Sequence, residues 1–333
     1  VGHDLPDILT ICYRPQLWNI YSSYREISMW LQVRPVLALF FLSLGQYLSA
    51  APVNALDADS TLRDDLVTKA RVFQDQGYRT QAIALLQQAD QLAKQLSEDS
   101  SETGLLLAQL YFELGEYPLS LNLITRTLDQ SESIAIEARA LNILASVQSI
   151  LNDVKTATDT FARAYTASLA SGDQVMTLTV LTNHLRHELD NKNANKSLAI
   201  GKQLLTLSST LSGRSDSVEI QISIGDLFIR IADQTGEDNF YRQALSILQQ
   251  AETTAKNQGQ VRLQSYAIGH QGRLLINQNK LEDGIQRLTT ANFLANTRRA
   301  FESAYLWQWQ LARALRLQGR TDDAILGYQT AIG

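Results

Sequence analysis

Small and apolar residues recur along most of the chain in a repeating frame that predicts pairs of antiparallel helices. Three alanines, Ala70, Ala108 and Ala145, stand 38 and 37 residues apart, and equivalent positions after each carry matching residue types. A second small residue follows twelve positions later, at Ala82 in the first copy and Ala157 in the third. Small residues let two helices approach closely, while larger apolar residues fill the space between them. The frame therefore predicts helical hairpins that stack along the chain.

A glycine or asparagine stands seven residues after the first small residue of each clear copy. These residue types adopt the left-handed backbone conformation that ends a helix. We therefore expect the first helix of each pair to end at Gly77, Gly115, Asn152, Asn279 and Gly319. Pro118 is expected in the first turn of a second helix, where the missing N–H of proline is tolerated.

Two more copies of the frame begin at Gly272 and Ala312, and Ala324 is the second small residue of the last copy. Two less regular hairpins are predicted between the third copy and these two. The seven predicted hairpins cover residues 63–96, 101–130, 138–170, 173–212, 215–257, 265–298 and 305–332. Stacked hairpins bury a continuous core that no single hairpin could bury alone.

This frame resembles the tetratricopeptide repeat (TPR), a helix-turn-helix unit with small, aromatic, glycine and alanine positions in the same order. The consensus unit has about 34 residues, whereas the clear copies here are spaced 37 to 40 residues apart. The resemblance implies an all-α fold, a right-handed α-solenoid of about seven TPR-like helical hairpins over residues 56–333.

Composition and charge narrow the function classes. Of the 333 residues, 45% are hydrophobic and 19% are charged, which is typical of a folded globular chain. Only one of the five prolines lies beyond residue 52, as a long helical array requires. The net charge of −5 argues against a nucleic-acid partner, because binding phosphates takes clustered lysine and arginine. A single cysteine excludes a disulfide framework.

Residues 29–55 have the pattern of a signal peptide. Arg34 precedes an apolar stretch of about thirteen residues, from Val36 to Leu48, and small residues follow it. The stretch is shorter than the roughly twenty residues that span a bilayer. We therefore expect a periplasmic or secreted protein with no stable membrane span after leader removal, and a cytoplasmic location is the alternative. Residues 1–28, which contain the single Cys12, are interpreted as a doubtful upstream extension.

The last two hairpins carry a more specific pattern. The run Trp-Gln-Trp-Gln at 307–310 is followed by Arg313. Around it, residues 265–332 resemble the TPR region that precedes the caspase-like domain in bacterial CHAT-domain proteins. That domain uses a His–Cys pair, and Cys12 lies ahead of the signal-like segment. The resemblance therefore implies the scaffold part of such a protein without its catalytic domain.

Motifs for catalysis or metal binding are missing from the sequence. Neither a phosphate-binding loop nor the G-x-G-x-x-G and G-x-S-x-G patterns occur. His184 and His187 stand three residues apart on one predicted helix, but zinc needs three or four ligands. We therefore favour a packed or exposed histidine pair, and we expect no enzymatic activity, no metal and no cofactor.

The first helices of the hairpins are expected to line the concave face of the solenoid, where a partner would bind. In the C-terminal hairpins the candidate partner-binding residues are Tyr266, Arg273, Trp309, Arg313 and Arg316. Arginines beside aromatic rings suit a peptide carboxylate or an acidic segment. In the alternative interpretation, the tryptophans belong to the core and the arginines are solvated.

Three hypotheses for the function follow from these patterns. The first is a non-catalytic, exported TPR scaffold that binds a protein or peptide partner. The second is a truncated N-terminal half of a CHAT-domain peptidase, in which the repeats regulate or target catalysis. The third is a cytosolic TPR regulator that senses peptides.

Overall fold

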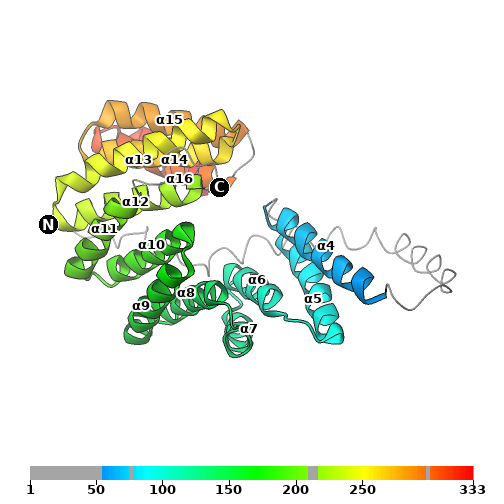
Figure 1. The fold of residues 1–333 in the computed structure, drawn as a ribbon. Coiled ribbons are helices and arrows are strands. Elements are labelled where there is room, and N and C mark those ends of the chain that lie inside the picture. Colours follow the sequence, from blue (N-terminus) through cyan, green and yellow to red (C-terminus); the bar gives the residue numbers. More distant parts are fainter. Residues whose placement is uncertain (1–54, 76–77, 209–216, 298–300, 333) are drawn as a thin grey trace, which may run out of the picture. The chain divides into compact units, whose positions relative to one another are not determined.

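The computed structural model describes residues 55–75, 78–208, 217–297 and 301–332 (Figure 1). All regular secondary structure within these ranges is helical, which confirms the predicted all-α fold of TPR-like hairpins. The described helices are α4 (Ala55–Asp75), α5 (Arg79–Leu96), α6 (Ser101–Glu113), α7 (Tyr117–Gln130), α8 (Ile134–Ile150), α9 (Val154–Ser171), α10 (Gln174–Asp190), α11 (Ala194–Ser208), α12 (Val218–Thr235), α13 (Asp238–Asn257), α14 (Val261–Asn277), α15 (Leu281–Thr297), α16 (Phe301–Leu317) and α17 (Thr321–Ile332).

The helices form two compact units, and the boundary between the units falls between Leu151 and Asn152. In the described ranges, the first unit contains α4 to α8 and the second contains α9 to α17. The boundary lies inside the third predicted hairpin, 138–170. Each unit has buried apolar clusters of its own, around Leu110 and Ile124 in the first and around Phe228 and Trp307 in the second.

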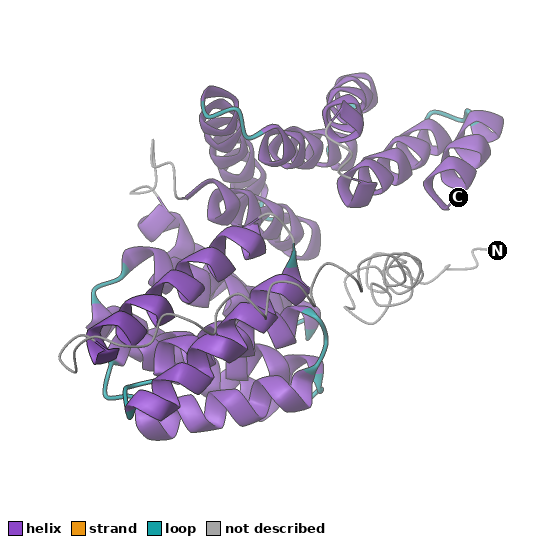
Figure 2. Ribbon diagram, turned by 90° about the vertical axis from the view of Figure 1, so that its right-hand side faces the viewer, coloured by secondary structure: helices purple, strands orange, loops and turns teal. Residues whose placement is uncertain are grey.

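Where the structure describes the connections, short turns join successive helices within each unit, and neighbours in sequence pack together (Figure 2). The small residues of the repeat frame lie where the helices touch. A Cβ atom on Gly272 would come within 3.1 Å of the Gly284 carbonyl oxygen, so the backbones of α14 and α15 are in contact there. The other small residues of the frame are also buried: Ala70, Ala82, Ala108, Ala145, Ala157, Ala312 and Ala324.

The turns have the backbone geometry expected of their residues. Gly115, Asn152, Asn279 and Gly319 all have positive φ, between 61° and 80°. Pro118 occupies the first turn of α7. The turn between α10 and α11 departs from the frame, because Lys192 takes the left-handed conformation there, with φ of 57°.

In each pair after α4 and α5, the first helix is buried more deeply than the second. Ten residues of α14 are buried, compared with four of α15, although both helices have 17 residues. The reason is that α14 contacts α12 and α16 as well as α15, its hairpin partner, and α13, the second helix of the preceding hairpin. Within the second unit, first helices such as α14 therefore form the inner row of helices.

Three predictions concern residues outside the described ranges. They are the upstream extension at residues 1–28, the predicted signal peptide except for its last residue, 55, and the helix end at Gly77. In the part of the chain that the structure describes, none of the helices combines the length and apolar character needed to cross a membrane.

Candidate functional site

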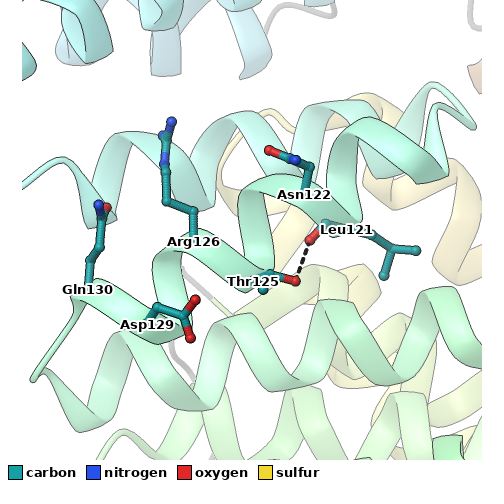
Figure 3. Close-up of a pocket in the computed structure, with 6 residues that line it drawn as sticks. All are labelled: Leu121, Asn122, Thr125, Arg126, Asp129 and Gln130. Carbon is teal, nitrogen blue, oxygen red and sulfur yellow. Dashed lines mark hydrogen bonds between the residues drawn. The ribbon is translucent and has the colours of Figure 1, made fainter.

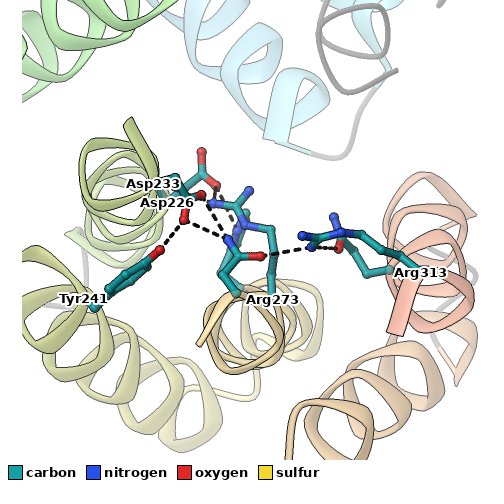
Figure 4. Close-up of polar contacts among 8 residues, drawn as sticks. Asp226, Asp233, Tyr241, Arg273 and Arg313 are labelled. Carbon is teal, nitrogen blue, oxygen red and sulfur yellow. Dashed lines mark hydrogen bonds and ion pairs between the residues drawn. The ribbon is translucent and has the colours of Figure 1, made fainter. Parts of the chain in front are cut away.

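Polar side chains connect the faces of three neighbouring first helices in the second unit. Helix α14 packs against α12 on one side and α16 on the other. We call the connected residues the polar strip; they are Asp226, Asp233, Tyr241, His270, Arg273, Asn277, Gln310 and Arg313. Figure 4 shows Tyr241 and the two aspartates on one side of Arg273, and Arg313 on the other side.

The buried part of the polar strip is an ion cluster between α12 and α14. Arg273 Nη2 lies 2.7 Å from Asp226 Oδ1 and donates to the Asp226 backbone carbonyl at 3.3 Å. His270 Nδ1 lies 3.1 Å from the same carboxylate oxygen. Burial acts to raise the pKa of Asp226, but the guanidinium of Arg273 and the neighbouring His270 ring outweigh it and hold this pKa far below its ordinary value. The charge of Arg273 is therefore used to neutralise Asp226.

The outer part of the polar strip is a chain of hydrogen bonds from α13 to α16. Tyr241 Oη donates to the carboxylate of Asp233, and Asn277 Nδ2 donates to both Asp233 oxygens at 2.9 and 3.1 Å. Arg313 Nη1 in turn donates to Asn277 Oδ1 at 3.0 Å. Burial and the hydrogen bond to Asp233 raise the pKa of Tyr241 well above its ordinary value, so Tyr241 stays a neutral donor. The Asn277 carboxamide links the two ends of this chain.

Two of the five residues predicted to bind a partner belong to the polar strip. Arg273 is only 9% exposed because it is paired with Asp226. Arg313 is half-buried, and Asn277 joins it to the other side of the strip. The structure therefore brings Arg273 and Arg313 onto one connected surface, but it buries the first of them.

The structure places the other three predicted residues differently. Tyr266 packs edge-on against the buried Trp307, with 5.7 Å between the ring centroids. Trp309 packs against Tyr328 of α17, with 6.1 Å between the centroids. Arg316 is exposed on the last turn of α16, one turn beyond Arg313. Of these three, only Arg316 can extend the polar strip toward solvent.

The sequence analysis missed Asp226, Asp233 and Asn277. A signal for them was present, because Asp226 and Asp233 are seven residues apart, and Arg273 and Asn277 are four apart, so that each pair shares a helix face. What the sequence did not show was which two faces meet. Asp233 and Asn277 are 44 residues apart along the chain, and Asp226 and Arg273 are 47 residues apart.

Similar polar links join first helices elsewhere in the chain. In the second unit, Arg230 of α12 forms an ion pair with Asp190 of α10. In the first unit, Glu102 of α6 lies between two arginines, 2.7 Å from Arg71 of α4 and 3.3 Å from Arg139 of α8. An oppositely charged pair between neighbouring first helices is therefore a recurrent way of aligning one hairpin with the next.

A second buried polar cluster joins α9, α10 and α11. Glu188 is 1% exposed, and its Oε1 accepts hydrogen bonds from Thr158 at 3.1 Å and from Lys196 at 3.4 Å. His184 Nε2 lies 3.3 Å from the same oxygen, and the His184 ring stacks on Phe161 with 5.2 Å between centroids. Glu188 is therefore a buried carboxylate that depends on donors from α9 and α11, with the His184 ring of α10 beside it.

The hydrogen bonds around His187 assign its tautomer. Thr158 gives its only hydroxyl proton to Glu188, so His187 Nε2, which lies 3.1 Å from Thr158 Oγ1, must be the donor in that contact. His187 Nδ1 is left as the acceptor for Asn191 Nδ2 at 3.3 Å. His187 is therefore neutral, with its proton on Nε2, and it is 2% exposed.

Acidification below about pH 6.5 is expected to destabilise this histidine cluster. Burial lowers the pKa of both His184 and His187 from the ordinary value of 6.5. Such a histidine binds fewer protons in the folded chain than in the unfolded chain. The stability that depends on its neutral form is therefore complete above pH 6.5 and is lost as the pH falls below it. We expect the melting temperature to fall between about pH 7.5 and about pH 5.

The matched variant for this prediction carries both His184→Gln and His187→Gln. Glutamine cannot titrate, so the decrease in melting temperature over the same pH range should be smaller than in the unaltered chain. Equal decreases in the two proteins would contradict the assignment of the pH dependence to these histidines.

Two surface depressions of the described chain are each lined by a single helix. One, of about 590 Å³, is shown in Figure 3 and is lined by α7 residues Leu121, Asn122, Thr125, Arg126, Asp129 and Gln130. Its arginine is already bound to Asp90 of α5 at 2.8 Å. The other, of about 600 Å³, lies on α13. Ligand pockets bring polar groups together from several elements, so we do not assign a site to either depression.

The described residues contain no group of three or more His, Cys, Asp or Glu side chains placed to hold a metal ion. The polar strip offers hydrogen bonds and charges. It is suited to recognising a polar partner along a helical surface.

Comparisons with solved structures place the fold among TPR-type helical repeat proteins. Aspartyl phosphate phosphatase F from Bacillus subtilis matches with a TM-score of 0.58 and 11% identity, over 99% of this chain and 84% of that one. A Rap protein complexed with Competence and Sporulation Factor matches with a TM-score of 0.55 and 14% identity, over 83% of this chain and 76% of that one.

A third structure carries the repeat in its name. It is a signal transduction ATPase with a tetratricopeptide repeat sensor from Pyrococcus horikoshii, with a TM-score of 0.54, 14% identity, and coverage of 84% of this chain and 49% of that one. No protein-family model matches this chain, and no curated protein matches it. At these identities the likeness shows the fold alone. None of the matches bears on the resemblance to CHAT-associated repeats, which stays a prediction.

Proposed function

We propose that this chain is a non-catalytic TPR-type scaffold that binds an extended protein or peptide segment across the first helices of its second unit. The observation that carries the proposal is the polar strip, in which α12, α14 and α16 present hydrogen-bonding and charged groups on one connected surface. A peptide backbone carries one donor and one acceptor per residue, and the strip offers both kinds of group.

Asn277 is the residue on which this proposal depends most. Its carboxamide has a donor and an acceptor on one rigid group, and it is half-buried at the centre of the outer strip. The same group can pair with the C=O and N–H of one partner residue, as a neighbouring strand would. The structure of a Rap protein complexed with Competence and Sporulation Factor supports the proposal to the extent that a protein of this fold forms such a complex.

The test is a selection of binding peptides, because the partner is unidentified. A library of random twelve-residue peptides is selected against the full chain, and the affinities of the recovered peptides are measured by titration calorimetry. Asn277→Ala should weaken binding about tenfold, as expected for the loss of two buried hydrogen bonds at about 0.5–1.5 kcal/mol each. The matched control is Asn257→Ala, at an exposed position of α13, which should bind as the unaltered chain does.

Two results would contradict the proposal. One is the failure to recover any peptide that binds the unaltered chain. The other is recovery of peptides whose affinity is the same for Asn277→Ala and for Asn257→Ala. A melting curve for each variant shows whether a loss of binding accompanies a loss of folding.

We also propose that the chain is exported. The support is the basic residue, short apolar stretch and small residues at 29–55, which all lie at or before the start of the described helices. A chain that starts at Met29 and carries a C-terminal tag should be recovered outside the cytoplasm of a bacterial host, shortened by about 27 residues. An uncleaved chain that stays in the cytoplasm would overturn this part.

A further inference from the structure

The carboxylates on the first helices of the second unit are paired with basic side chains, with one exception. Helices α10, α12 and α14 carry five carboxylates, and four of these lie within 3.4 Å of a lysine or arginine nitrogen. The four pairs are Glu188–Lys196, Asp190–Arg230, Glu219–Arg262 and Asp226–Arg273. The exception is Asp233 of α12, whose hydrogen bonds within the described part of the chain come from Tyr241 and Asn277.

Asp233 is nevertheless held in a fixed position. Its carboxylate accepts hydrogen bonds from Tyr241 of α13 and from Asn277 of α14, so two neighbouring helices orient it (Figure 4). Both donors are neutral groups, so neither offsets the charge of the carboxylate. The Asp233 side chain is exposed. It is therefore a charged group that is already oriented before a partner arrives, which lowers the entropy lost on binding.

The charges around Asp233 favour a cation as its partner. The positive charge of Arg273 reaches Tyr241, but Arg273 is paired with Asp226 at 2.7 Å. Asp238, the first residue of α13, is exposed and adds a second negative charge beside Tyr241. A positive group is therefore attracted to this corner of the unit, whereas a negative group is repelled.

The hydrogen bonds to Asp233 indicate which kind of cation fits. Its Oδ1 accepts from Tyr241 Oη and, at 3.1 Å, from Asn277 Nδ2, while its Oδ2 accepts from Asn277 Nδ2 alone, at 2.9 Å. A carboxylate oxygen has about two acceptor positions, so the free position is on Oδ2. A bidentate guanidinium needs a free position on both oxygens, whereas an ammonium group is a point charge that needs only one. The geometry therefore favours lysine over arginine.

We propose that Asp233 binds a lysine side chain of the partner segment. This inference rests on the proposed function, because it names one residue of the segment that binds the polar strip. Asp233 Oδ2 lies 2.9 Å from Asn277 Nδ2, so a segment that contacts Asn277 passes beside this carboxylate, within reach of a long lysine side chain. An N-terminal ammonium group fits less well, because the segment would then have to end at the strip that it is proposed to cross.

The first test changes the peptide and leaves the chain unaltered. Peptides selected from the random twelve-residue library are synthesised with acetylated N-termini, and they should share a lysine. Replacing this lysine by glutamine should weaken binding about threefold or more at low salt, and replacing it by arginine should weaken binding by a smaller factor. Both differences should shrink as the salt concentration rises, because salt screens exposed charges.

The second test changes the chain. Asp233→Asn should weaken binding of the lysine peptides about threefold or more at low salt. The glutamine peptides should bind Asp233→Asn and the unaltered chain equally, because the two changes remove the same contact. The matched control is Asp238→Asn, which removes a negative charge from the same corner but leaves the carboxylate held by Tyr241 and Asn277. It should keep the preference for lysine. Melting curves show whether both variants are folded.

Several results would overturn the inference. They are selected peptides without a common lysine, binding of the arginine peptides as tight as that of the lysine peptides, and equal weakening by Asp233→Asn and Asp238→Asn. Loss of binding on N-terminal acetylation would also overturn it, since the cation would then be the peptide N-terminus. If peptides bind and depend on Asn277 but not on a lysine, this inference fails while the proposed function stands. If no peptide binds the unaltered chain, both fail.

Discussion

Replacing Trp307 by alanine is expected to lower the free energy of unfolding by about 3–5 kcal/mol, the range for a large aromatic side chain removed from a core. Trp307 is completely buried in the second unit. Its indole Nε1 donates to Ser265 Oγ at 3.0 Å, and its ring lies flat against Gly269, where a Cβ atom would come within 2.4 Å of it. The loss therefore combines lost burial, a cavity and a broken hydrogen bond. Urea unfolding followed by circular dichroism measures it.

The matched control is Trp309→Ala, since the two tryptophans lie two residues apart on α16. Trp309 is only half-buried and packs edge-on against Tyr328. Trp309→Ala should lower the free energy of unfolding by less than half as much as Trp307→Ala does. Equal losses for the two variants would show that α16 does not have the orientation described here.

Replacing Arg273 by alanine is expected to lower the free energy of unfolding by about 3–5 kcal/mol, for a different reason. The change leaves the buried carboxylate of Asp226 without its guanidinium partner, and only His270 remains beside it. Removing one member of a buried ion pair is unfavourable chiefly because the other charge stays buried. The same urea unfolding experiment measures the effect. Arg242→Ala, at an exposed position of α13, is the control and should be nearly neutral.

A double variant separates an unpaired charge from a simple loss of packing. Asp226→Leu together with Arg273→Met removes both charges and keeps apolar volume, so it should recover at least half of the stability lost by Arg273→Ala. No recovery would contradict the ion-pair explanation.

The pH dependence of Arg273→Ala gives a further check. The pKa of Asp226 is lower in the folded chain than its ordinary value of about 3.8. The stability from its charged form is therefore complete above about pH 4 and is lost as the pH falls below that value. Without Arg273 this loss at acid pH should shrink, because burial then favours the neutral carboxyl group. An unchanged acid dependence would count against the assignment.

Much of the fold could be predicted from the sequence because its signals are local. A glycine or asparagine at the end of a helix indicates its own backbone conformation, as Gly115 and Asn279 do with φ of 79° and 61°. Small residues at Gly272 and Gly284 likewise indicate where two consecutive helices touch. By contrast, nothing in the repeat frame showed the boundary between two units after Leu151. The same residue types recur at the positions of the frame before and after this boundary.

The candidate site was only partly predictable. Arg273 and Arg313 were identified because the repeat frame places them on the first helices of the last two hairpins, which were expected to line the concave face. The sequence did not show that Arg273 is paired with Asp226, 47 residues earlier in the chain. Trp309 was expected beside these arginines, but α16 turns it toward Tyr328 of α17.

The sequence by itself determined the helices, their turns and the all-α hairpin architecture, because each depends on residues within about one repeat of each other. Only the tertiary structure decided which charged residues are neutralised and which face solvent. The pairing of Asp226 with Arg273 and the exposure of Asp233 follow from how first helices of successive hairpins align. That alignment depends on side-chain packing and ion pairs between segments more than 40 residues apart, and local residue patterns do not encode such contacts.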